Sequence, residues 1–164
     1  MTRKRTLAAA VVALILALAV HPARAQTQAV GPTTATPALT LGEAAEGAGR
    51  VLIGQLFVVS GLYKIGNFAG VAARMTAVGL PAAEVLLVPT IALEVGAGLA
   101  LAFDWHADWA SAALAAFVIA VTPLFHNYWA IPDAVAALEQ HRLFFRNLAV
   151  LGGLLTVFGG EQQD

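Results

Sequence analysis

Glu94 is the residue of this sequence whose position points most directly to chemistry. It lies roughly 11 residues, or about 16 Å of helix, into the apolar segment 82–103. Placing a charged side chain at that depth in a bilayer costs about 2.5–3.5 kcal/mol on insertion scales. We therefore expect Glu94 to be protonated or to have a bound partner, and a carboxyl group facing lipid is the least plausible arrangement.

Lys64 and Ser60 are candidate partners for this carboxyl group. With Asn67 they follow the spacing i, i+4, i+7, so the three side chains share one helix face. In straight and upright helices, Glu94 would lie roughly 10 Å deeper than Lys64. The lysine side chain can bridge part of that gap, or it can extend outward to the membrane interface and leave Glu94 to pair elsewhere.

His126, Thr122 and Asn147 are further polar candidates on two later apolar segments. One polar face from each helix of a four-helix bundle can point to a common centre. His126 can instead be an interfacial hydrogen-bonding residue, and Asn147 a contact between helices. We therefore predict one intramembrane polar cluster, with Glu94, His126 and Lys64 as candidate catalytic residues and Asn147, Ser60 and Thr122 as candidate cofactor contacts.

Familiar catalytic motifs are not found in the sequence. It has no phosphate-binding loop, nucleophile elbow or zinc-protease helix. The cysteine count is 0, which excludes disulfides, thiol chemistry carried by this chain, thiolate metal sites and a lipoprotein anchor. His126 with Glu94 would make only two metal ligands, and no pair of histidines is placed to hold haem. We predict no metal site.

The elements that must position these side chains are membrane helices. Hydrophobic residues make up 59% of the chain and charged residues 12%, against roughly 25% charged in soluble domains. Four apolar segments of about 17–22 residues match the thickness of a bilayer core. The predicted fold is an all-α, four-helix transmembrane bundle with spans at about 50–67, 82–103, 108–128 and 142–158. The net charge of -1 gives no indication of nucleic-acid binding.

The N-terminal segment has the layout of a secretory signal peptide. The basic residues 3–5 precede the apolar run 7–20, and Ala23-Arg24-Ala25 follows as a cleavage site. We predict a signal peptide over residues 1–25 and a flexible linker over 26–47, which is rich in Thr, Ala, Pro and Gly. An uncleaved signal anchor is the alternative.

Basic residues in the connections predict the orientation of the spans. Lys64, Arg74, Arg142 and Arg146 lie on one side, and Arg50 lies with several acidic residues on the other. The positive-inside rule places the first group in the cytoplasm, and Arg142 and Arg146 are read as determinants of this topology. We predict a multi-pass protein of the bacterial inner membrane, with both ends of the mature chain outside.

Several segments in one order resemble the DoxX family. They are residues 50–68, residues 91–98 (IALEVGAG) with Glu94, residues 122–129 (TPLFHNYW) with His126, residues 144–153 (FFRNLAVLGG) with Asn147, and the short connection 77–81. The resemblance covers about residues 48–160. This resemblance implies a four-helix membrane bundle associated with redox chemistry. Members of the DoxX family include a small membrane subunit of a thiosulfate:quinone oxidoreductase and proteins that link membrane and soluble partners in thiol defence.

The sequence is compatible with three functions. The first is a membrane subunit of a redox complex, linked to a quinone or to thiol or sulfur chemistry, in which Glu94 and His126 relay protons or bind a quinone oxygen. The second is a non-enzymatic scaffold or assembly factor, whose polar cluster only locks the bundle. The third, less favoured, is a small transporter, because no inverted repeat is visible. The expected partners are membrane lipid, an oxidoreductase subunit and a second copy of the chain.

Overall fold

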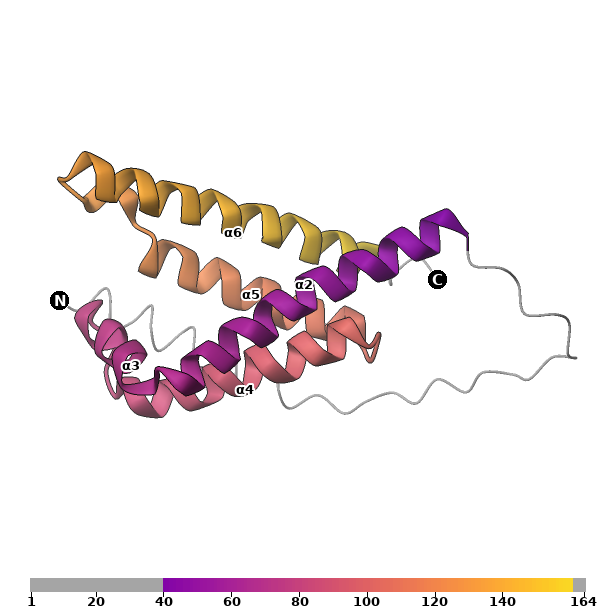
Figure 1. Cartoon of the computed structure of the whole chain (residues 1–164), viewed down its shortest axis with the longest axis horizontal. Helices are drawn as coiled ribbons and strands as arrows, with labels where there is room; N and C mark the ends of the chain where they lie inside the picture. Colours follow the sequence, from indigo (N-terminus) through magenta and orange to yellow (C-terminus); the bar gives the residue numbers. More distant parts are fainter. Residues whose placement is uncertain (1–39, 161–164) are drawn as a thin grey trace, which may run out of the picture.

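A computed structural model describes residues 40–160 of the chain, and within that range it contains helices and no strand (Figure 1). The predicted signal peptide, most of the predicted linker and the last four residues lie outside the described range. The elements are α2 (Leu41–Gly66), α3 (Phe68–Ala77), α4 (Ala83–Ala102), α5 (Ala107–Phe125), the 3-10 helix η1 (Tyr128–Ala130) and α6 (Ala134–Gly160).

The described part of the chain holds four helical stretches long and apolar enough to cross a membrane: Leu41–Gly66, Ala83–Ala102, Ala107–Ala130 and Ala134–Gly160. Large apolar side chains such as Leu52, Val59 and Val85 are exposed on their outer faces. In water, so much exposed apolar surface would drive association, whereas lipid is a suitable solvent for it. The predicted all-α transmembrane bundle is confirmed.

Helix α2 begins earlier than the sequence pattern predicted. The hydroxyl of Thr40 accepts a hydrogen bond from the backbone N–H of Glu43 at 3.2 Å, and the Glu43 carboxylate accepts one from the backbone N–H of Thr40 at 2.7 Å. This reciprocal capping box satisfies amides that a helix start leaves unpaired. The linker prediction is therefore wrong for residues 41–47, which form the first turns of α2.

Helix α6 also begins before its predicted span. The carboxylate of Asp133 accepts a hydrogen bond from the backbone N–H of Ala136 at 2.8 Å, so the helix begins at Ala134 rather than near Arg142. The first turns of α6 combine an alanine-rich stretch with Glu139, Gln140 and His141, which interrupt the apolar pattern, so hydropathy alone did not reveal them. The short helix α3 was not predicted either, because its ten residues are too few to cross a bilayer.

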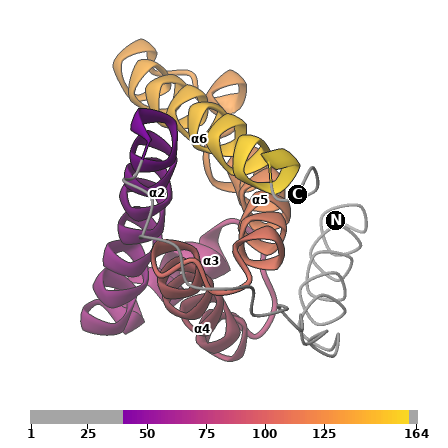
Figure 2. The ribbon, with the colours of Figure 1, turned by 90° about the vertical axis from the view of Figure 1, so that its right-hand side faces the viewer.

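The four long helices surround a common axis, as Figure 2 shows in a view along the bundle. Helix α4 packs on both α2 and α5, and α5 packs on α6. We call the end of the bundle that carries α3, η1 and the start of α6 the basic end, because Lys64, Arg74, Arg142 and Arg146 belong to it. At the opposite end α2 and α6 meet, where Ile53 lies against Gly153, and the two helices diverge toward the basic end (Figure 1).

Small residues bring α2 and α4 close together. A Cβ atom added to Gly54 would lie 2.5 Å from the carbonyl oxygen of Gly98, and one added to Gly98 would lie 2.8 Å from the carbonyl oxygen of Gly54. Only residues without a side chain permit such an approach of two backbones. This contact sets the distance between the two helices that carry Lys64 and Glu94.

The apolar core is concentrated away from the basic end. Its main cluster joins Phe57, Leu101, Leu114 and Leu154, the last three of which are 0% exposed. A smaller cluster lies between α3 and α4, around Met75 and Leu87. Residues of both clusters line one cavity, and Ser60, Lys64 and Glu94 line it with them.

Candidate functional site

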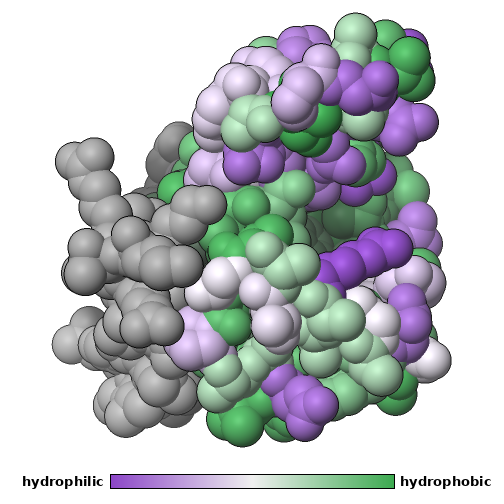
Figure 3. Space-filling view, turned by 90° about the vertical axis from the view of Figure 1, so that its left-hand side faces the viewer, coloured by the Kyte–Doolittle hydropathy of each residue, from purple (hydrophilic) through white to green (hydrophobic). Residues whose placement is uncertain are grey.

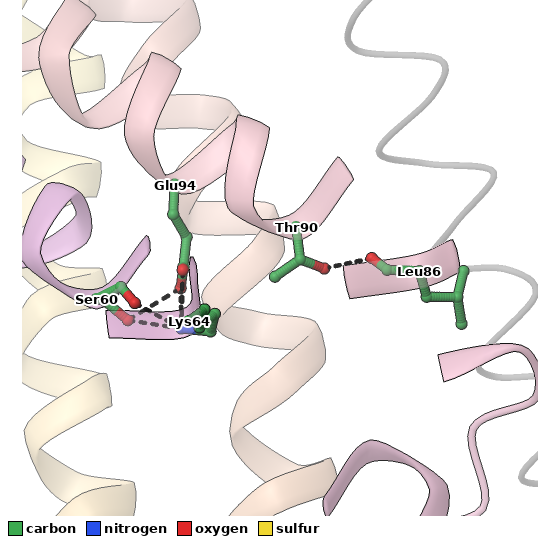
Figure 4. A network of polar contacts seen from close by, with 5 residues as sticks. All are labelled: Ser60, Lys64, Leu86, Thr90 and Glu94. Atoms are coloured by element: carbon green, nitrogen blue, oxygen red, sulfur yellow. Dashed lines mark hydrogen bonds and ion pairs between the residues drawn. The ribbon is translucent and has the colours of Figure 1, made fainter. Parts of the chain in front are cut away.

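A buried ion pair joins α2 and α4. The ammonium Nζ of Lys64 lies 2.9 Å from Oε1 and 2.8 Å from Oε2 of Glu94. Glu94 is only 3% exposed, and the side chain of Lys64 is 20% exposed. Figure 4 shows the carboxylate pointing from α4 straight at the lysine of α2. In such a shielded place, the attraction between the charges offsets much of the cost of burying them.

Ser60 forms hydrogen bonds with both members of the ion pair. Its hydroxyl accepts a hydrogen bond from Lys64 Nζ at 2.7 Å and donates one to Oε1 of Glu94 at 3.3 Å (Figure 4). The ammonium, the hydroxyl and the carboxylate therefore form a closed triangle. A proton can move between the three groups over hydrogen-bond distances without any rearrangement of the helices.

The direction of helical side chains explains why Lys64 and Glu94 meet despite their different predicted depths. Long side chains in a helix lean toward its N-terminus. Helix α2 runs toward the basic end and α4 runs away from it, so Lys64 leans into the bundle and Glu94 leans back toward the basic end. Because Lys64 Nζ reaches Ser60, it lies about one turn, or roughly 5 Å, deeper than its own Cα.

Gly61 allows this approach from the backbone side. A Cβ atom added there would lie 2.6 Å from Cγ2 of Val95 and 3.4 Å from Cβ of Glu94. Gly61 is next to Ser60 in the chain and is buried against α4. A larger residue at this position would separate the helices where the ion pair forms.

The other predicted site residues join α5 to α6. Asn147 donates a hydrogen bond to the Thr122 hydroxyl at 3.1 Å, and Nδ1 of His126 lies 2.8 Å from Oε1 of Gln140. Within residues 40–160, neither His126 nor Asn147 bonds to Glu94. The predicted single polar cluster is thus divided between two helix pairs, α2–α4 and α5–α6.

A cavity of about 930 Å³ separates the two groups. Five of the six predicted site residues line it, namely Ser60, Lys64, Glu94, His126 and Asn147, whereas Thr122 is buried behind its wall. Most of the remaining wall is apolar, with Phe57, Leu87, Phe117 and Val150 among its residues. Figure 3 shows the basic end hollowed, with hydrophilic residues around the opening and hydrophobic residues deeper inside. The site is therefore an apolar chamber with a few converging polar groups, as ligand pockets commonly are.

Several lining residues were not identified as site residues from the sequence. Arg74 belongs to α3, which was not predicted, and Arg146 was read only as a determinant of topology. Thr90 lines the cavity one turn from Glu94, and its hydroxyl donates to the carbonyl of Leu86 at 2.8 Å. The i, i+4 spacing of Thr90 and Glu94 would have indicated this shared face.

Asn67, predicted to share a face with Ser60 and Lys64, lies apart from the ion pair. Asn67 follows the last residue of α2 as its C-cap, and its side chain donates to the hydroxyl of Tyr63 at 3.1 Å instead of reaching the ion pair. Between residues 40 and 160, no group of three or more His, Asp or Glu side chains is placed to hold a metal ion.

Comparisons with known proteins agree with this architecture. Residues 47–127 match the family model described as DoxX. Inner membrane protein YqjF of Escherichia coli strain K12 is 35% identical over 106 residues, which span 65% of this chain and 75% of that protein. No solved structure matches the chain. The matched residues include Ser60, Lys64 and Glu94 and three of the four apolar helices, and the chain belongs to the DoxX family of multi-pass inner membrane proteins.

Proposed function

We propose that this protein is the membrane subunit of a redox complex and that its cavity receives the head group of a quinone. The observation that carries the proposal is the Lys64–Glu94 ion pair on the wall of an apolar cavity of about 930 Å³. Quinones partition into the membrane, and a pocket for one needs apolar walls with a few hydrogen-bonding groups aimed inward. The residues of this cavity fit that requirement.

A quinone would supply two-electron, two-proton redox chemistry at this place. The protein's own part is to donate hydrogen bonds and to hold or move protons. Lys64 and Ser60 are hydrogen-bond donors that line the cavity, and Glu94 accepts hydrogen bonds from both. On the opposite wall, the bond between His126 and Gln140 fixes the imidazole ring. Side chains that can take up or release a proton therefore lie on two sides of the cavity.

The electron donor in this proposal belongs to a partner protein. The chain has 0 cysteines, so any protein thiol that takes part in redox chemistry with it must belong to another polypeptide. The basic end, where the cavity opens, is the end from which such a partner would have access. In this proposal the protein supplies the quinone-binding site in the membrane, and the partner protein supplies the electrons.

Purification from the native membrane in a mild detergent tests the proposal. We expect an oxidoreductase subunit in stoichiometric amount, identified by mass spectrometry, and a quinone in the organic extract of the complex. A preparation that contains neither would contradict the redox assignment.

The role of the ion pair is tested with a matched pair of substitutions on α4. Glu94→Gln should abolish electron transfer from the partner to quinone while the protein still inserts into the membrane. Glu84→Gln makes the same chemical change at an exposed residue in the first turn of the same helix, away from this cavity, and should leave transfer unchanged. Normal transfer in the Glu94 variant would remove Glu94 from the mechanism.

A non-enzymatic scaffold is the second candidate, because the bonds of Lys64 with Glu94 and of Asn147 with Thr122 join neighbouring helices. In that case, replacing Ser60, Lys64 and Glu94 together by Ala, Met and Leu would preserve both folding and the cellular phenotype. A stable triple variant that loses the phenotype would exclude this candidate. The same variant therefore distinguishes the two functions.

A further inference from the structure

The opening of the cavity carries an excess of positive charge. Lys64 and Glu94 neutralise each other inside. Arg74 of α3 and Arg146 of α6 also line the cavity, and both side chains are exposed at the basic end. Within the described part of the chain, neither guanidinium has a hydrogen bond or an ion pair. The opening therefore presents two positive groups, contributed by elements on different sides of the cavity.

The wall on the α2 side reaches the lipid-facing surface of the bundle. Leu56 and Tyr63 both line the cavity, yet they are 42% and 55% exposed. Helices α2 and α6 meet near Ile53 and Gly153 and diverge toward the basic end (Figure 1). An apolar chain from the surrounding bilayer can therefore reach the cavity between α2 and α6, past Leu56 and Val150, which both line it.

From these two observations we propose that the cavity is a binding site for an acidic membrane lipid. Its anionic head group is held by Arg74 and Arg146, and one acyl chain lies along the apolar wall near Phe57 and Val150. Guanidinium groups suit phosphate because they donate two parallel hydrogen bonds to its oxygens. A zwitterionic head group would bring its own cation to the opening and would lose this advantage.

This inference is independent of the redox function. If both ligands bind, the acyl chain and the quinone occupy the same apolar space, so each excludes the other. The acidic lipid content of the membrane would then set how much of the protein is open to quinone. If only the lipid binds, the redox proposal fails and the lipid site stands.

The test uses the full-length protein, delipidated in a neutral detergent and followed by native mass spectrometry and by its thermal unfolding midpoint. Phosphatidylglycerol should bind in one-to-one ratio and raise the midpoint. Phosphatidylcholine of the same chain length and inorganic phosphate should do so much more weakly. Equal binding of phosphatidylcholine would overturn the role of charge, and equal stabilisation by phosphate alone would show a free-anion site instead.

Matched substitutions on α6 separate this site from general attraction to anionic lipid. Arg146→Gln should weaken binding of phosphatidylglycerol roughly fivefold, and adding Arg74→Gln should weaken it by about the same factor again. Arg142→Gln removes a charge one turn away that does not line the cavity, so it should change binding little. Arg146→Lys keeps the charge and the fold and should retain part of the affinity. Equal losses in the Arg142 and Arg146 variants would overturn the proposal.

Discussion

The ammonium of Lys64 lies within 2.9 Å of both carboxylate oxygens of Glu94, although the two residues lie on different helices and start from different depths. Lipid and apolar side chains surround the two charges, so each charge offsets much of the free-energy cost of burying the other. The pair therefore behaves as a unit, and changing one member should have a different effect from changing both.

Lys64→Met should lower the free energy of unfolding by about 3–5 kcal/mol, because it leaves the Glu94 carboxylate buried without its cation. Adding Glu94→Gln to this variant should restore most of the loss. Unfolding in mixed micelles, followed by circular dichroism, measures both effects. If the Lys64 variant is as stable as the wild type, the ion pair contributes nothing to the fold.

Gly54→Ala should destabilise the contact between α2 and α4 by about 1–3 kcal/mol, since the new Cβ would collide with a backbone atom that cannot move aside. That Cβ would lie only 2.5 Å from the carbonyl oxygen of Gly98. Gly96→Ala is the matched control on the neighbouring helix, because nothing lies within 4 Å of its added Cβ. Equal unfolding midpoints for the two variants would contradict the close approach of the helices.

Thr122 and Asn147 should show an energetic coupling between α5 and α6. In a double-mutant cycle with Thr122→Val and Asn147→Leu, we expect about 0.5–2 kcal/mol, the usual range for hydrogen bonds between membrane helices. Thr156→Val is a suitable control partner for Asn147, because the Thr156 hydroxyl bonds within its own helix. Additive losses for Thr122 and Asn147 would mean that their bond is not formed in the membrane.

Single cysteines can determine which end of the bundle faces the cytoplasm, because the natural chain has 0 cysteines. The charge distribution predicts that Ala45→Cys, at the start of α2, reacts with a membrane-impermeant maleimide in intact spheroplasts. Glu139→Cys, in the first turns of α6, should react only after the membrane is opened. Both positions are exposed, so accessibility within the protein does not bias the result. The reverse labelling pattern would invert the predicted topology.

The architecture was predictable because long apolar runs have few alternatives. A segment such as 82–103 can satisfy its backbone in lipid only as a helix. The helix starts were less predictable, since the turns that follow Thr40 and Asp133 mix small apolar residues with charged ones and give no continuous apolar run. Helix α3 went unpredicted for a related reason, because it packs on α4 rather than crossing the membrane.

The candidate site was predictable in its residue types and only partly in its contacts. The spacing of Ser60 and Lys64 indicated one face of a helix, and the structure places that face against Glu94. Which helix faces which depends on side-chain packing between distant segments, and local spacing does not encode it. For this reason the partner of His126, which is Gln140, could not be found from the sequence.

Because α2 and α6 diverge, the distance between them at the cavity opening depends on the angle at which they cross. Because α6 touches α2 near Gly153 and carries Arg146 and Asn147 further along the same rod, a small tilt at the contact becomes a larger displacement at the opening. The width of the opening therefore depends on the angle at which α6 crosses α2, whereas the ion pair depends on the separate contact between α2 and α4.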